Sequence, residues 1–129
     1  MSDHTIYVKV APSSTAYELS GAVNGLNAEI KIRKGDVLTF HLDTPNHPFW
    51  IKTVQGMGKN SSVSSGISGI GQGNTTGTLI WDTNKIKEGT YYYQCEFHDS
   101  MFGEIIVNPG KVIIHVIVSQ TIYNNYNID

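Results

Sequence analysis

Four residues whose side chains bind soft metal ions lie in two short stretches of the sequence. Residues 91–103 read Y-Y-Y-Q-C-E-F-H-D-S-M-F-G and contain Cys95, the single cysteine, followed at intervals of three by His98 and Met101. Residues 45–50 read P-N-H-P-F-W and offer His47. One thiolate, two imidazoles and a weakly bound thioether match the ligands of a mononuclear copper centre. Zinc normally takes four firm ligands, and a thioether is a poor one.

The sequence around Cys95 resembles the copper loop of the cupredoxins, a family that includes plastocyanin, azurin, pseudoazurin and amicyanin. The resemblance rests on residues 89–95, G-T-Y-Y-Y-Q-C, and on the spacing Cys-x2-His-x2-Met-x-Gly, which is most similar to the short loop of amicyanin. Residues 30–40, I-K-I-R-K-G-D-V-L-T-F, also look like the family's paired strands ahead of its first histidine. The resemblance covers roughly residues 15–108. It implies a cupredoxin-like Greek-key β-sandwich that holds one copper ion through His47, Cys95, His98 and Met101.

Each of these residues also has a purely structural interpretation. A lone cysteine such as Cys95 is often a buried thiol, and Met101 could fill a gap in the core. His47 could be a turn residue held between two prolines. These alternatives stay open at the level of sequence. The remaining histidines are not expected to be ligands: His4, His41 and His115.

Two positions beside the expected ligands depart from the family pattern. In cupredoxins the residue after the first histidine commonly donates its backbone N–H to the cysteine sulfur, but here that residue is Pro48, which has no N–H. Plastocyanin and amicyanin often have proline two residues after the cysteine, where this chain has Phe97. We therefore predict that the Phe97 N–H replaces the missing donor, which would tune the reduction potential. Gln94 replaces the family's surface aromatic residue, which argues against a plastocyanin-like electron route there.

The composition favours one globular domain without a nucleic-acid partner. The chain has 129 residues, of which 40% are hydrophobic and 16% charged, enough to form an independent core. Its net charge of −2 provides no basic field for nucleic acid. A single cysteine excludes an intramolecular disulfide and a two-cysteine binuclear copper centre.

The sequence does not indicate a compartment. The N-terminal residues M-S-D-H-T lack the basic region and apolar run of a signal peptide. No apolar stretch approaches the ~20 residues of a membrane-spanning helix, so a membrane span is not expected. Cupredoxins usually work in periplasmic, lumenal or extracellular spaces.

Alternating polar and apolar residues predict an all-β chain. Strands are expected over residues 5–10, 16–21, 28–33, 37–43, 47–53, 77–82, 89–95 and 104–107. Residues 55–76 are rich in glycine and serine, and we expect a long irregular excursion over the surface. Many short strands with frequent turns predict a β-sandwich, which we assign to a copper-binding domain over residues 1–110.

Residues 111–129 form a separate C-terminal strand and tail in this interpretation. The predicted extra strand, residues 111–119, is apolar on both faces and lies beyond the usual end of the family fold. Strands of that kind are covered on both sides. We therefore expect residues 111–119 to contact another subunit.

Two functions are compatible with these patterns. The first is a type 1 copper protein that carries single electrons between redox partners, which dock weakly on an apolar face around His98. The alternative is a cupredoxin-fold structural or interaction module of a larger assembly, such as a viral or surface particle, with copper structural or absent. An enzyme is not expected, because a saturated ligand set leaves no open position for substrate.

Overall fold

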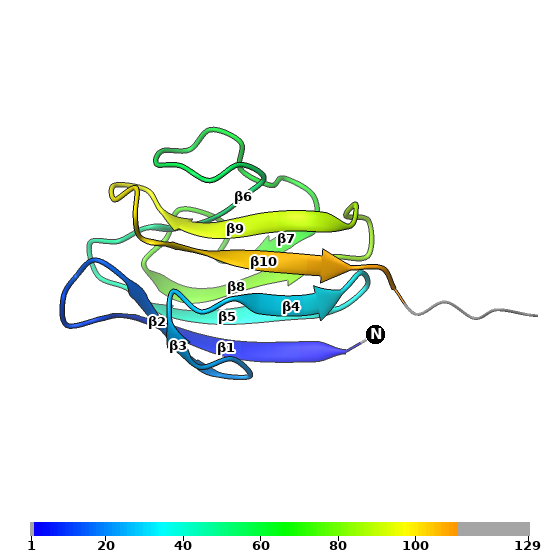
Figure 1. The fold of residues 1–129 in the computed structure, drawn as a ribbon, viewed down its shortest axis with the longest axis horizontal. Helices are drawn as coiled ribbons and strands as arrows, with labels where there is room; N and C mark the ends of the chain where they lie inside the picture. The colour runs from blue at the N-terminus through cyan, green and yellow to red at the C-terminus, as the bar shows by residue number, and fades with distance from the viewer. Residues whose placement is uncertain (1, 111–129) are drawn as a thin grey trace, which may run out of the picture.

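The structure, a computed structural model that describes residues 2–110, is a sandwich of two β-sheets (Figure 1). None of these residues is helical, so this part of the chain has no helix that could cross a membrane. The strands are β1 (Asp3–Val10), β2 (Tyr17–Gly21), β3 (Gly25–Leu26), β4 (Ile30–Arg33), β5 (Val37–Asp43), β6 (Phe49–Lys52), β7 (Ile67–Gly69), β8 (Thr76–Asp82), β9 (Gly89–Cys95) and β10 (Phe102–Asn108).

The two sheets are built from strands that are distant in the sequence. The larger sheet has the order β3-β2-β1-β5-β8-β7, in which β1 and β5 run parallel. The smaller sheet has the order β4-β10-β9-β6, in which β10 runs parallel to β4 and antiparallel to β9. The chain crosses between the sheets several times, and the predicted all-β sandwich is confirmed.

The core lies between the sheets and is formed largely by alternate residues of the longer strands. On β5 the side chains of Leu38, Phe40 and Leu42 are buried, whereas His41 is half-buried on the opposite face. This is the alternation that the sequence predicts for a strand with one face in the core. The rings of Phe40 and Phe49 are 5.0 Å apart and pack beneath one end of the sandwich.

The glycine- and serine-rich segment is more ordered than expected. It contains the short strand β7, and it forms single bridges with β6 at Phe49–Asn74 and Lys52–Ser62. The Gln72 side chain continues this pairing, since its amide bonds both the N–H and the carbonyl of Ile51. The segment therefore covers the free edge of β6. The strand predicted over residues 111–119 lies outside the described residues, and its contact with another subunit stays a prediction.

The pairing of β6 with β9 brings the candidate ligands to one rim. Phe49 is directly opposite Cys95 in this antiparallel pair. His47 precedes Phe49 by two residues, and His98 follows Cys95 by three, so both histidines extend beyond the same end of the ladder. Figure 1 shows the connection between β9 and β10 at the end of the sandwich opposite the N-terminus.

Candidate metal centre

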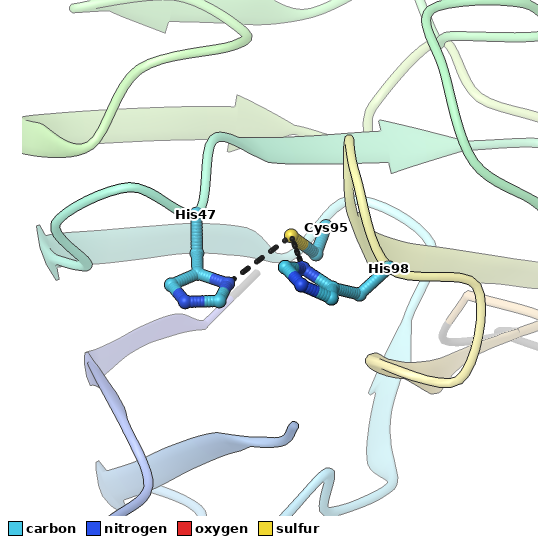
Figure 2. A group of neighbouring side chains, drawn as sticks. All are labelled: His47, Cys95 and His98. Atoms are coloured by element: carbon cyan, nitrogen blue, oxygen red, sulfur yellow. Dashed lines mark hydrogen bonds between the residues drawn. The ribbon is translucent and has the colours of Figure 1, made fainter. Parts of the chain in front are cut away.

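His47, Cys95 and His98 converge at this rim, as Figure 2 shows. Nδ1 of each histidine lies 3.5 Å from the Cys95 sulfur, and the two imidazole rings are 4.8 Å apart. The three candidate ligand atoms all lie within 4.8 Å of one another. The structure therefore brings together three of the four residues that the sequence singled out, across a separation of 48 residues.

The spacing of these atoms fits a shared metal ion. With metal–nitrogen and metal–sulfur bonds of about 2.05 and 2.3 Å, as for zinc, a nitrogen and a sulfur 3.5 Å apart subtend an angle of about 107° at the metal. That value is close to tetrahedral. The Cys95 sulfur therefore has, toward each histidine, the separation expected of two ligands of one ion.

Met101 is fixed beside this trio by its backbone. The Cys95 N–H donates to the Met101 carbonyl at 2.9 Å, and the Met101 N–H donates to the His98 carbonyl at 3.2 Å. The Met101 side chain is fully buried and belongs to the same core cluster as Cys95. This position is compatible with core packing and with a thioether ligand.

Gly103 makes room for the strand that leaves the site. A Cβ at this position would overlap the ring of Tyr93, whose hydroxyl donates to the Ala28 carbonyl at 2.6 Å. The absence of a side chain at Gly103 therefore lets β10 start directly against the buried phenol.

His47 is held by a tyrosine from the opposite sheet. The Tyr17 hydroxyl donates to the His47 carbonyl at 2.8 Å, and the Pro48 carbonyl lies 3.2 Å away. Burial raises the pKa of Tyr17 far above its ordinary value, and the neighbouring Cys95 raises it further. The phenol therefore stays protonated and remains a donor. The sequence shows only that Tyr17 alternates with the apolar Leu19, which indicates burial but gives no sign of this contact.

The two histidines differ in exposure. His47 is 7% exposed, and burial together with the neighbouring His98 lowers its pKa. Its imidazole is therefore neutral at pH 7, the form in which histidine binds metals. His98 is the most exposed of the three and forms the side of the site that faces solvent.

The predicted hydrogen bond from Phe97 to the cysteine sulfur is wrong. Within residues 2–110, the hydrogen-bonding contacts of the Cys95 sulfur are those with the two histidines. The reason lies in the backbone, where the Glu96 N–H donates to the Pro48 carbonyl at 3.0 Å. This bond continues the β6–β9 pairing by one residue past Cys95.

The other histidines in the described part of the chain lie away from this site, as expected. His4 bonds the Asp36 carboxylate at 2.9 Å. His41 bonds the Thr78 hydroxyl at 2.9 Å and stacks on Tyr7. Both are accounted for by these contacts, whereas His115 lies outside the described residues.

Comparison with known proteins identifies the fold but gives no relative at the level of sequence. No protein-family model matches the chain, and no curated protein sequence matches it. Among solved structures it is similar to rusticyanin from Thiobacillus ferrooxidans, at 21% identity and a TM-score of 0.54, over 82% of this chain and 77% of that one.

Two other rusticyanin structures give the same result. Reduced rusticyanin matches at 20% identity and a TM-score of 0.53, over 82% of this chain and 79% of that one. A structure described as that of the copper protein rusticyanin matches at 18% identity and 0.53, over 82% and 78%. At these identities the similarity concerns the fold. The chain therefore has the cupredoxin fold that its sequence resemblance implies.

Proposed function

We propose that this protein is a mononuclear type 1 copper protein that carries single electrons. The observation that carries the proposal is the convergence of one cysteine sulfur and a ring nitrogen of each of two histidines within 4.8 Å. His47, Cys95 and His98 would hold the copper ion, and Met101 would add a fourth, weaker sulfur ligand. Bound copper supplies the one-electron chemistry by cycling between its cuprous and cupric states.

The donor set favours copper over the other common ions. A thiolate and two imidazoles bind zinc as well as copper, but a buried thioether beside them is typical of copper sites. The similarity in fold to rusticyanin, described as a copper protein, supports the same choice. The buried, neutral imidazole of His47 presents its lone pair without first losing a proton.

The surroundings of the site suit electron transfer to a protein partner. The scaffold fixes the loop of His47 through Tyr17 and closes the Cys95–Met101 loop through two backbone bonds, so the ligands have little freedom to rearrange. Phe97, beside His98, is 59% exposed. An exposed apolar side chain next to the solvent-facing ligand is compatible with the weak, small interfaces of redox partners.

Copper loading followed by metal analysis and visible spectroscopy tests this function. We expect stoichiometric copper and an intense visible band from the cysteine-to-copper charge transfer. Cys95→Ser should abolish the band, because the sulfur donor is replaced by a hydroxyl. Failure of the wild-type protein to retain copper, or a band of the same intensity in Cys95→Ser, would contradict the proposal.

The alternative function, a module of a larger assembly, depends on residues outside the described part of the chain. It stays a prediction based on the apolar residues 111–119. Light scattering of the full chain and of a chain ending at residue 110 distinguishes the two functions. A monomer in both cases argues against assembly.

A further inference from the structure

The Gln94 side chain connects the candidate ligand loop to a second loop. Its position on β9 directs it away from the core face that Cys95 occupies, yet Gln94 is 0% exposed. The amide nitrogen donates to the His98 carbonyl at 2.8 Å and to the Cys95 carbonyl at 3.0 Å. The amide oxygen accepts from the Gln55 side chain at 3.1 Å and from the Gly56 N–H at 3.3 Å. The amide nitrogen of Gln94 therefore bonds the ligand loop, and its amide oxygen bonds the second loop.

The second loop, residues 54–58, which we call the strap, also bonds the ligand loop directly. The Gly58 N–H donates to the Glu96 carbonyl at 2.9 Å. The Gln55 amide donates to the Asp99 carbonyl at 2.9 Å. These two bonds fall on either side of His98, so the strap holds the ligand loop both before and after this residue.

A buried lysine anchors the strap to β6. Lys52 is 2% exposed, and its ammonium group donates to the carbonyls of Gly56, Met57 and Gly58. Burial lowers the pKa of Lys52, whereas Asp99 acts in the opposite direction. A buried ammonium needs compensating oxygen atoms, and three carbonyls of the strap provide them. Lys52 thus fixes the strap to the strand that directly follows the turn of His47.

We propose that Gln94 is a positioning residue, which through the strap holds His98 in the geometry of a ligand before any metal binds. Apart from the Met101 N–H, Gln94 is the donor that the described residues give to the His98 carbonyl. The relevance of this geometry to copper rests on the proposed function. The hydrogen bonds of Gln94 to the strap and to the ligand loop, which together we call the clamp, are a property of the metal-free chain.

Two substitutions separate the bonds that Gln94 accepts from the strap from the bonds that it donates to the ligand loop. Gln94→Leu keeps the approximate size of the side chain and removes all its hydrogen bonds. Gln94→Glu keeps an acceptor for Gln55 and Gly56 but places carboxylate oxygens against the carbonyls of Cys95 and His98. Thr90→Ala is the matched control, because Thr90 is an exposed residue of the same strand.

The first measurement is amide hydrogen exchange in the metal-free proteins. In Gln94→Leu we expect the Gly58 and Met101 amides to exchange faster by roughly tenfold, and Thr90→Ala to behave as wild type. Gln94→Glu should release the Met101 amide more than the Gly58 amide. If Gln94→Leu folds poorly, the Gln94→Glu comparison still tests the clamp. Unchanged exchange in both Gln94 variants would overturn the proposal.

The second measurement uses the copper-loaded proteins. We expect the reduction potential and the visible band of both Gln94 variants to shift, while those of Thr90→Ala do not. If both Gln94 variants show the same visible band as the wild-type protein, the positioning role is overturned. If exchange responds as expected but wild-type protein takes up no copper, the clamp is supported and the proposed function fails.

Discussion

Removal of one buried hydroxyl tests how the loop of His47 is held. In Tyr17→Phe the ring keeps its contacts with Phe49 and Tyr93, whose centroids lie 5.2 and 6.1 Å from its own. The Pro48 carbonyl keeps the Glu96 N–H as a donor. Among the described residues, however, the His47 carbonyl loses the one donor it has.

The expected cost follows from this difference between the two carbonyls. A net hydrogen bond contributes about 0.5–1.5 kcal/mol, and a buried polar group without a partner costs about 1–3 kcal/mol. With one carbonyl affected, Tyr17→Phe should lower the free energy of unfolding by about 2 kcal/mol. This loss would be a substantial fraction of the roughly 5–15 kcal/mol typical of a domain.

Denaturant unfolding of the metal-free protein, followed by tryptophan fluorescence, measures this effect. Tyr92→Phe is the control, since Tyr92 is half-buried and its hydroxyl has no hydrogen-bond partner within residues 2–110. Its effect should stay within about 0.5 kcal/mol. A Tyr17→Phe protein as stable as this control would refute the reasoning.

The same comparison has an expected pH dependence. The pKa of Tyr17 is raised in the folded state by burial, so the phenol ionises first in the unfolded chain. The stability that Tyr17 contributes should therefore be constant below about pH 10 and decline above it. In Tyr17→Phe this alkaline decline should be smaller, and equal declines in the two proteins would contradict the assignment.

Two further substitutions test the opposite end of the sandwich and the start of β10. Burial would raise the pKa of Asp36, but bonds from the Arg33 N–H and the His4 ring outweigh it and hold the pKa below its ordinary value. Asp36→Asn should therefore lower the unfolding free energy at pH 7 by about 1–3 kcal/mol, with the difference narrowing as pH falls through the folded-state pKa; equal losses at pH 7 and pH 2 would count against it. Gly103→Ala should cost about 1–3 kcal/mol in thermal unfolding, because the new methyl group displaces the Tyr93 ring; an unchanged melting temperature would contradict this.

The parts of the structure that could be predicted from sequence are those set by local periodicity. The alternation of β5, with Phe40 inward and His41 outward, follows from the pleat of a single strand. The Cys95–His98 spacing is likewise local. His47 is predicted because a copper site of this type needs a second histidine and residues 45–50 offer one, but nothing near it in the sequence states that Phe49 pairs with Cys95.

The errors in prediction have a common physical origin in backbone contacts between distant segments. The donor expected at Phe97 follows from comparing single positions of a family loop, whereas the structure extends the β6–β9 pairing through a backbone bond between Glu96 and Pro48. Strand alternation correctly directs Gln94 away from the core, but it cannot show that the strap covers this face. Backbone hydrogen bonds form through the N–H and C=O groups that nearly all residues share, so the identity of the side chains gives little indication of them.

The strap illustrates why a segment of low sequence complexity can be structurally specific. Its carbonyls at Gly56, Met57 and Gly58 accept from the Lys52 ammonium group through main-chain atoms. In the sequence, Lys52 lies near the end of the strand predicted over residues 47–53 and looks like an exposed residue, since a lysine is rarely buried without partners. Its burial is stable because the partners are supplied by glycine-rich backbone. A glycine-rich segment that follows a strand ending in lysine can therefore form an ordered, hydrogen-bonded loop over that strand. In this chain the loop is the strap, and it is hydrogen-bonded to the candidate metal loop.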